Sequence, residues 1–553
     1  MTDTGDATLP AATRSRIVSR PGTVRWLALT GVLLLAAALR IAAAATQPNI
    51  IWPDEVFQTV EPAHRLVYGS GLMSWEWIVG IRSWLVPALF APLLVLARTL
   101  QLGPGGTTAL VSGAMILLSL VPVAIGFRWG ERTAGLAGAI LVSGVTAVWV
   151  DLIYIAPHPL TDVIATDLLA LALYLAGTPS PSARRLAAAG ALLGLLCYLR
   201  MQLGPAALVV AGFACGRAWS RWRPLTLGGA AVVGILGALD WITLGTPLQS
   251  IWLNFYFNII GRVSNEYGVD SPMFYVSGLT ELWGGLTVVI LVLAVFGRRR
   301  WPTLFWVPVT VFLTQSLVAH KEWRFIFPAL TPLILLCGLQ TVALLPRLEA
   351  ELKKVSHPRA TAVGLCLAAF AFASLVVGAG ETYRLFWQNR RAIIAAFELV
   401  SRQNGACGVG VLFDAGRNGN PAGYSWVGSQ GASALPAGVP LYPAVSDYTW
   451  RSAGAYNWAV IGSGAQSPPA PFHVIRCFGH AYGQTGAGTT SACAWARPGH
   501  CDRSVAVLPM INWPPYFTDA NGAVRRDRLQ PRFLGMTPPL HFVSQDLRAT
   551  TPP

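Results

Sequence analysis

The sequence predicts a polytopic α-helical membrane protein. Of its 553 residues, 54% are hydrophobic and only 12% are charged, and the mean hydropathy is +0.51. Soluble globular proteins carry about a quarter charged residues, so this composition excludes a soluble enzyme, a disordered chain and a fibrous protein. Apolar stretches of about 20 residues, long enough to cross the hydrocarbon core of a bilayer, recur along the chain.

About eleven of these stretches are predicted membrane spans. A further apolar stretch, 83–101, contains Pro87 and Pro92 and follows a polar, aromatic segment. We interpret it as a juxtamembrane or re-entrant helix. The predicted spans are 26–46, 107–127, 134–152, 162–177, 186–200, 203–219, 224–243, 278–297, 301–319, 324–345 and 360–379.

The basic residues predict the orientation. Polytopic proteins concentrate Lys and Arg in cytoplasmic loops. If 83–101 does not span, all basic clusters fall on the side of the N-terminus; if it spans, every later cluster moves to the other side. The first solution places the N-terminus in the cytoplasm and the C-terminus outside. The clusters are Arg14, Arg16, Arg20 and Arg25; Arg128 and Arg132; Arg184 and Arg185; Arg217, Arg221 and Arg223; Arg298 to Arg300; and Arg347, Lys353, Lys354 and Arg359.

The first span is interpreted as a retained helix. A cleaved signal is the alternative, since Ala42 to Ala45 offer small residues, but the basic leader is long and Arg40 interrupts the cleavage region. The net charge of +15 therefore reflects membrane topology, and we expect no nucleic-acid partner.

The last part of the chain differs in composition. Residues 380–553 contain no Lys and no long apolar run, which predicts an extracytoplasmic α/β domain with short strands such as 408–413, 457–462 and 503–508. The expected division is a cytoplasmic tail (1–24), a transmembrane catalytic domain (25–379) whose outer loop 47–106 is catalytic, and the extracytoplasmic domain (380–553). The other outer segments are 153–161, 244–277 and 320–323.

The cysteines divide in the same way. Those within spans are expected to act as small apolar groups: Cys197, Cys215, Cys337 and Cys366. Four in an oxidising compartment predict two disulfides with three possible pairings: Cys407, Cys477, Cys493 and Cys501. We favour Cys493–Cys501 with Cys407–Cys477. A zinc site is the alternative, but the sequence has no CxxC pair, so no metal site is expected.

The first candidate site follows the first span. Asp54 and Glu55 are adjacent carboxylates among aromatic residues at the membrane boundary, where a general base can reach a hydroxyl of a lipid-borne substrate. The alternative is that Pro53-Asp54-Glu55 only starts a surface helix.

The second candidate site is the charged turn His320-Lys321-Glu322-Trp323-Arg324-Phe325. Arg offers a fork and Lys a point charge for phosphate. Basic side chains can also snorkel at an interface. Lys321 is one of only three lysines, and the turn lies opposite the basic clusters, so we favour an anion site.

The third candidate is loop 244–277, with Asn254, Asn258, Arg262 and Asn265-Glu266-Tyr267-Gly268. These residues fit sugar or pyrophosphate contacts, or equally an interfacial aromatic belt. Smaller candidates are His158, Thr161, Asp162, Arg200 and Gln202. The sequence contains no nucleotide-binding, metalloprotease or nucleophile-elbow motif and no evident inverted repeat.

These motifs resemble one GT-C family of mannosyltransferases, which includes the GPI mannosyltransferases and the α-1,2 and α-1,6 mannosyltransferases of N-glycan assembly. Residues 320–325 match its HKExRF motif in full. Its HPDE-x-FQ, E-x-x-H, WE[WY] and FYG-x-x-PWHWY series are similar to Trp52-Pro53-Asp54-Glu55-Val56-Phe57-Gln58, Glu61-Pro62-Ala63-His64, Trp75-Glu76-Trp77 and Asn265 to Tyr275. The resemblance covers roughly residues 25–345.

The resemblance implies a GT-C fold and inverting transfer of mannose from a polyprenyl-phosphate-linked donor to a hydroxyl of a lipid-linked glycan or glycolipid. It implies Asp54 as the general base, with Glu55 as the second candidate. His320, Lys321 and Arg324 are the implied donor-phosphate ligands, so no metal or cofactor is obligatory. The other candidate substrate contacts are Gln58, His64, Trp75, Glu76, Arg200, Gln202 and Tyr267.

The sequence also departs from the family. Trp52 replaces the usual His, and Pro157-His158-Pro159-Leu160-Thr161-Asp162 replaces a TRT-L-[ST]-N segment and lacks its Arg. The Gly-, Ala- and Arg-rich composition indicates a bacterial, in particular actinobacterial, cell membrane protein. The alternative functions are transfer of another polyprenyl-phosphate sugar such as arabinofuranose, a lipid-glycan flippase, and an inactive binding subunit.

Overall fold

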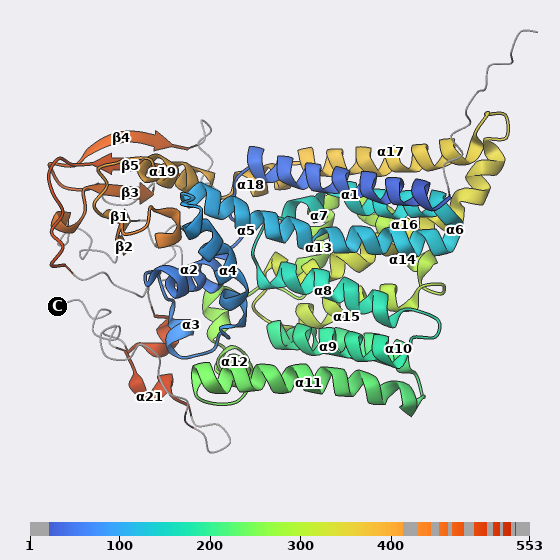
Figure 1. Cartoon of the computed structure of the whole chain (residues 1–553), viewed down its shortest axis with the longest axis horizontal. Coiled ribbons are helices and arrows are strands. Elements are labelled where there is room, and N and C mark those ends of the chain that lie inside the picture. The colour runs from blue at the N-terminus through green and yellow to red at the C-terminus, as the bar shows by residue number, and fades with distance from the viewer. Residues whose placement is uncertain are drawn as a thin grey trace, which may run out of the picture.

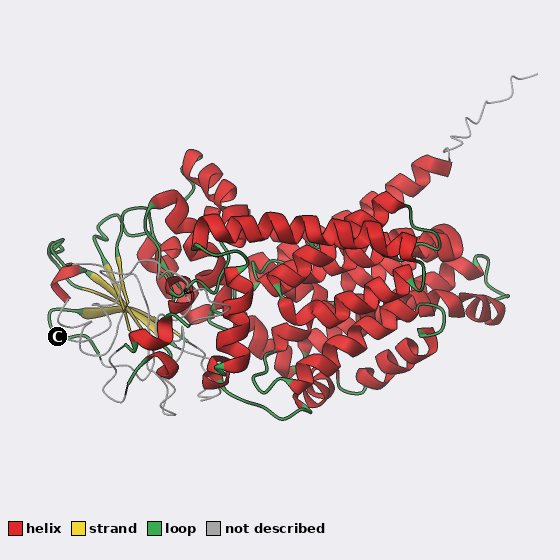
Figure 2. Ribbon diagram, turned by 90° about the horizontal axis from the view of Figure 1, so that it is seen from below, coloured by secondary structure: helices red, strands yellow, loops and turns green. Residues whose placement is uncertain are grey.

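The computed structural model consists of a bundle of long helices with a small β-sheet at one end (Figure 1). Seen from below, the strands gather at that end and helices form the rest (Figure 2). We call the two ends of the bundle the sheet end and the basic end. The structure describes residues 21–412, 430–443, 453–462, 467–479, 491–505, 513–519, 524–531 and 537.

Most of the predicted spans coincide with helices that run roughly along one direction in Figure 1, whereas the span 278–297 is a pair of helices bent by 113°. Within the described residues, five helices are long and apolar enough to cross a membrane, and the bent pair α13–α14 gives a sixth. The other predicted spans are helices of 12 to 17 residues beside them. The bundle helices are α1 (Pro21–Thr46), α5 (Pro104–Leu118), α6 (Leu120–Val148), α8 (Thr161–Ala176), α9 (Ala183–Leu199), α10 (Gly204–Cys215), α11 (Trp219–Leu244), α13 (Phe274–Trp283), α14 (Leu286–Gly297), α15 (Pro302–Leu317), α16 (Phe327–Glu351) and α17 (Pro358–Ala379).

Helix α6 folds back on itself. Its backbone leaves helical geometry at Ala134 and at Gly135, whose φ of 65° favours glycine. On either side of this turn, Gly130 and Gly138 approach each other so closely that a Cβ on Gly130 would lie 2.1 Å from the carbonyl oxygen of Gly138. The two arms of α6 therefore belong to two predicted spans, 107–127 and 134–152.

Several basic clusters meet at the basic end. Arg132 Nη2 donates to the Tyr174 hydroxyl at 3.3 Å, and Arg185 Nη2 donates to the carbonyl of the same residue at 3.3 Å. Arg25 Nε lies 3.2 Å from Glu131 Oε1. These clusters thus share one side of the bundle, as predicted, while the orientation of that side relative to a membrane stays a prediction.

The stretch that was expected not to span forms the short helix α4 (Leu85–Thr99). It lies at the sheet end and packs against α2 (Glu61–Tyr68) (Figure 1). Together with α3 (Trp75–Ile78) and a π-helical turn at Val56–Val60, it belongs to the segment between α1 and α5. Other short helices at this end are α7 (Val150–Ile155), α12 (Gln249–Phe255), α18 (Glu381–Gln388), α19 (Arg391–Ser401) and α21 (Arg526–Leu529).

Within the described residues, the sheet contains five strands in the order β2-β1-β3-β5-β4. Strands β1, β2 and β3 are parallel, whereas β5 is antiparallel to β3 and β4. Two predicted strands are present, but residues 503–505 form a turn, and 506–508 lie outside the described residues. The strands are β1 (Val409–Leu412), β2 (Leu441–Pro443), β3 (Trp458–Gly462), β4 (His473–Phe478) and β5 (Ala492–Ala496).

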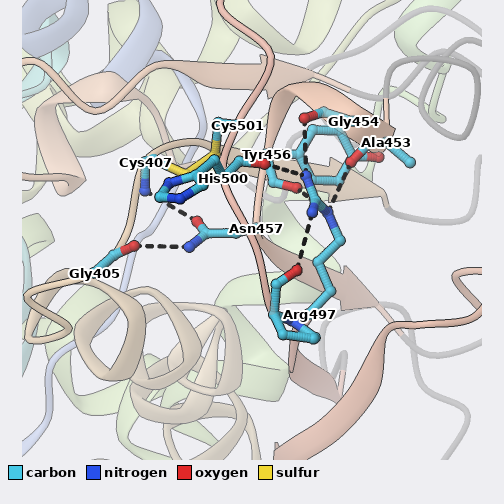
Figure 3. Close-up of a disulfide and its surroundings, with 10 residues drawn as sticks. Gly405, Cys407, Ala453, Gly454, Tyr456, Asn457, Arg497, His500 and Cys501 are labelled. Atoms are coloured by element: carbon cyan, nitrogen blue, oxygen red, sulfur yellow. Dashed lines mark hydrogen bonds between the residues drawn. A yellow bond between two sulfur atoms is a disulfide. The ribbon is translucent and has the colours of Figure 1, made fainter.

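All four C-terminal cysteines form disulfides, but our predicted pairing is wrong. Cys477 and Cys493 are cross-strand partners on β4 and β5, with Cα atoms 4.0 Å apart, and are bonded. Cys501 bonds Cys407 instead (Figure 3). Arg497, directly after β5, donates hydrogen bonds to the carbonyls of Ala453, Gly454 and Tyr456 before β3 and to that of His500 in its own loop. Strand register therefore decided a pairing that sequence separation could not.

Candidate active site

A cavity of about 1050 Å³ opens where the bundle helices meet the segment after α1. Apolar side chains such as Leu199, Leu282 and Leu330 line one part of it. The polar part collects side chains from loops far apart in the sequence. Its ionisable and amide residues include Asp54, Gln58, Glu76, Arg82, Arg200, Gln202, Asn254, Asn258, His320, Glu322, Arg324, Asn389 and Arg390.

Asp54 is one of two carboxylates, with Glu76, that the segment after α1 presents to this cavity. It is 6% exposed. It precedes the π-helical turn Val56–Val60, and Gln58 on that turn donates a hydrogen bond to it. Arg324 Nη1 lies 3.1 Å from Asp54 Oδ1. Burial raises the pKa of the Asp54 carboxyl above its ordinary value, and the Arg324 guanidinium opposes that rise.

Arg324 is the central cation of the site. Besides Asp54, its guanidinium pairs with Glu322 and lies 3.8 Å from Asp162 Oδ2. The Trp52 ring lies 5.9 Å away. Burial disfavours ionisation of Glu322, but Arg324 and His320 outweigh it and lower the pKa of Glu322 to about 2. The site therefore places three carboxylates within 3.8 Å of the guanidinium of Arg324.

The other two basic residues of the charged turn separate. His320 lines the cavity; its Nδ1 bonds the Gly268 carbonyl at 2.8 Å and its Nε2 contacts Glu322 Oε1 at 3.2 Å. Burial lowers the pKa of His320, but the hydrogen bond and negative charge of Glu322, together with the hydrogen bond to the Gly268 carbonyl, outweigh it and raise that pKa. Lys321 donates to the carbonyls of Val318 and Asp270 and does not line the cavity. The expectation that Lys321 contacts a phosphate stays a prediction.

Glu55 lies behind Asp54 rather than beside it. Its carboxylate accepts hydrogen bonds from the Ile51 N–H at 2.6 Å and from His158 Nδ1 at 2.7 Å. Neither Glu55 nor His158 lines the cavity. Because both are buried and bonded to each other, they join the loop before α8 to the Asp54 turn. Asp54 is therefore the better placed of the two predicted general bases.

A second ion pair in the cavity joins Glu76, which the sequence analysis selected, to Arg82, which it did not. Arg82 Nη2 lies 2.5 Å from Glu76 Oε1, and Gln58 Nε2 reaches Glu76 Oε2 at 3.1 Å. Glu76 was a candidate, whereas Arg82 was missed. The usable signal was an arginine on the side opposite the basic clusters. Arg200 lines the cavity and pairs with Asp162 at the start of α8.

The remaining candidates divide between cavity wall and support. Trp75 Nε1 donates to the Tyr267 hydroxyl at 3.0 Å, and both residues line the cavity, as does Gln202. His64 stacks on Tyr68 and bonds the carbonyl of Ser70, outside the cavity lining. The expectation that His64 contacts substrate stays a prediction. No metal-holding group of three or more His, Cys, Asp or Glu occurs within the described ranges.

The helix arrangement and this cavity define a multi-pass membrane protein with the GT-C fold. A solved structure of ArnT from Cupriavidus metallidurans bound to undecaprenyl phosphate is similar, with a TM-score of 0.51 at 12% identity over 85% of this chain and 98% of that chain. The apo structure of the same protein gives a TM-score of 0.51 at 13% identity. The chain belongs to the Alg9-like mannosyltransferase family, whose profile matches residues 31–404.

The similar curated proteins are mannosyltransferases by name. GPI mannosyltransferase 3 of Yarrowia lipolytica is 28% identical over 57% of this chain and 63% of its own length. The Drosophila melanogaster protein of that name is 27% identical over 54% of both chains. GPI alpha-1,2-mannosyltransferase 3 of Mus musculus is 27% identical over 56% of this chain and 58% of its own. The chain thus spans less than two thirds of the length of these relatives.

Proposed function

We propose that this protein transfers mannose from a polyprenyl-phosphate-linked donor to a hydroxyl of a lipid-linked glycan or glycolipid, with inversion at the anomeric carbon. The observation that carries the proposal is the buried contact of Asp54 with Arg324, 3.1 Å apart, in a cavity that is also lined by apolar side chains. Such a cavity suits a substrate that combines a charged group with a lipid chain.

In the proposed step, Asp54 accepts the proton of the acceptor hydroxyl as its oxygen attacks the anomeric carbon. The bond from that carbon to the phosphate oxygen breaks, and the polyprenyl phosphate leaves with the electron pair. General-base catalysis requires the carboxylate within hydrogen-bond reach of the hydroxyl. The Arg324 guanidinium beside Asp54 favours the ionised form of the base, whereas burial and the carboxylate of Glu322 oppose it.

The negative charge on the leaving phosphate needs compensation. Arg324, Arg200 and His320 are the cavity-lining cations closest to this role by their contacts with Asp54, Asp162 and Glu322. Positioned positive groups stabilise charge where it develops during the reaction. In this scheme the chain's own side chains supply that charge, and a metal ion is not required.

The lipid and the membrane side also belong to the proposal. The ArnT structure contains undecaprenyl phosphate, which supports a polyprenyl phosphate as the lipid here. The basic end would face the cytoplasm and the sheet end the outside of a bacterial cell membrane, because lysine and arginine concentrate in cytoplasmic loops. The donor would then enter the apolar part of the cavity from the bilayer.

The test is transfer by the reconstituted full-length protein. Proteoliposomes receive labelled polyprenyl-phosphate-mannose or polyprenyl-phosphate-arabinofuranose, each with lipid-linked glycan and glycolipid acceptors. We expect labelled product with the mannose donor. For Asp54→Asn we expect the transfer rate to fall on the order of 1,000-fold, because a general base typically contributes about 100- to 10,000-fold. Asp519→Asn, at an exposed position outside the cavity lining, is the matched control. Product from arabinofuranose alone would contradict mannose, and undiminished transfer by Asp54→Asn would contradict the base.

A further inference from the structure

Residues that follow α17 hold the turn that presents Asp54. Asn389 Nδ2 donates to the Ile50 carbonyl at 2.9 Å, and Arg390 Nη1 donates to the Ile51 carbonyl at 3.2 Å. Both donors lie between α18 and α19 and line the cavity. The backbone just before Asp54 is therefore fixed by side chains from more than 300 positions later in the chain.

A second connection is made by Glu61. This carboxylate is fully buried and accepts three backbone N–H bonds: from Leu72 at 2.7 Å, Ala432 at 3.1 Å and Ser433 at 2.7 Å. No ion pair involves Glu61 in the described part of the chain. A buried carboxylate is costly unless its oxygens are well bonded, so these N–H groups make the position specific for an acceptor. An amide nitrogen there would face an N–H donor.

The loop that reaches Glu61 approaches without room for a side chain. A Cβ on Gly431 would lie 2.1 Å from Glu61 Cδ. The φ of Gly431 is −126°, so the constraint is space rather than backbone conformation. Gly431, Ala432 and Ser433 thus form a backbone clamp on one carboxylate, and we call this contact the Glu61 clamp.

The two parts also share hydrophobic cores. Ile50, Val56 and Phe57 pack in one cluster with Phe397 of α19 and Val460 of β3. On the other side of the same segment, the Trp75 ring lies 5.0 Å from that of Phe517 and 6.4 Å from that of Phe257. The free energy gained by burying apolar side chains is roughly proportional to the apolar area removed from water. These contacts therefore stabilise the packing of the C-terminal part against the cavity wall.

We propose that the described residues of the C-terminal part (380–553) complete the active site by holding the segment 50–82 in its reactive conformation, with Glu61 as the positioning residue. Glu61 follows directly on the π-helical turn that carries Gln58, and Gln58 bonds Asp54. The Glu61 clamp thereby sets the place of the base. The sheet domain, most of which lies beyond the family match at residue 404, is a part of the catalytic unit and not a separate binding module. This inference rests on the proposed function.

The test compares Glu61→Gln with Glu398→Gln in the full-length protein. Glu398 is an exposed glutamate on α19 and gives a matched control in the same domain. For Glu61→Gln we expect kcat to fall on the order of 100-fold, because a misplacement of about 1 Å costs that much, while the KM for donor changes little. Hydrogen exchange should rise in residues 50–60 and not in the bundle. Glu398→Gln should match the wild type in both measurements.

Gly431→Ala is the second variant, because it displaces the carboxylate without removing it, and it should give the same two effects. Wild-type kcat and exchange in both variants would overturn the inference. An equal rise of exchange throughout the bundle would also overturn it, since the effect would then be general instability. If the wild type transfers no sugar at all, the proposed function fails, whereas the exchange of residues 50–60 still decides the role of the clamp.

Discussion

At the scale of single residues, the site depends on a few buried charged side chains that have ion-pair partners in common. Arg324 faces Asp54, Glu322 and Asp162, so its charge is divided among three acids. Removing one partner of a buried ion pair destabilises a protein by about 3–5 kcal/mol, because the other charge is left without compensation. Substitutions here therefore affect folding and function together, and the assays must separate the two.

Arg324→Ala should weaken use of the donor more than use of the acceptor, because the guanidinium is proposed to face the leaving phosphate. We expect the KM for donor to rise at least tenfold, which corresponds to about 1.4 kcal/mol, with a smaller change in the KM for acceptor. Initial rates with each substrate varied separately give both constants. An unchanged donor KM in a folded variant would remove Arg324 from the phosphate site.

The acid limb of the pH–rate profile should report Asp54. Burial raises the pKa of Asp54, and Glu76 adds to the rise. The base must be ionised, so the rate falls as the pH drops through that pKa. Glu76→Gln removes a negative neighbour, lowers the pKa of Asp54 and should move the acid limb to lower pH. A limb that does not move, or moves upward, would assign it to another group.

At the scale of elements, glycines set how closely helices pack. Helices α9 and α11 make the most extensive contact between elements within the described residues. A Cβ on Gly190 of α9 would lie 1.9 Å from the Leu225 carbonyl oxygen, and one on Gly228 of α11 would lie 2.0 Å from that of Ala187. Small residues allow such close approach of helices in membranes.

Gly190→Leu should therefore separate α9 from α11 and lower the free energy of unfolding by about 1–3 kcal/mol, the range for overpacking. Gly234→Leu on α11 is the matched control, because nothing lies within 4 Å of a Cβ at that position. Thermal unfolding in detergent measures both. Equal melting temperatures for the two variants would contradict the close contact seen here.

At the scale of the whole molecule, the proposed orientation puts the sheet end outside the cell and the basic end in the cytoplasm. Glu398→Cys should react with a membrane-impermeant maleimide in intact cells, whereas Arg298→Cys should react only after permeabilisation. Both positions are exposed. The four native free cysteines are buried or half-buried, so the wild type gives the background. The reverse pattern would invert the topology.

Much of this architecture was predictable because membrane spans are local. An apolar stretch of sufficient length must satisfy its backbone as a helix in lipid, whatever its neighbours do. Residues 83–101 contain a helix of 15 residues, and whether it spans the membrane stays a prediction. Asp54 was predicted from two adjacent carboxylates among aromatic residues. Arg324 was predicted from a charged turn on the side opposite the basic clusters. The structure placed both in one cavity.

Tertiary contacts decided what local pattern could not. Glu55 resembles Asp54 in sequence, but only the fold shows that it turns toward His158. Lys321 lies one residue from His320, yet it points to backbone carbonyls instead of the cavity. The disulfide pairing followed the register of β4 against β5.

The sequence by itself determined a multi-pass membrane protein, its main helices and the motifs that carry the candidate base and its cationic partner, because hydrophobic length and local charge need no partner to be recognised. The tertiary structure decided which of these charges share a cavity and which face the backbone. It also decided that residues after α17 hold the Asp54 turn. Those facts depend on contacts between residues hundreds of positions apart, such as Glu61 with Ala432 and Ser433, and no local pattern encodes them.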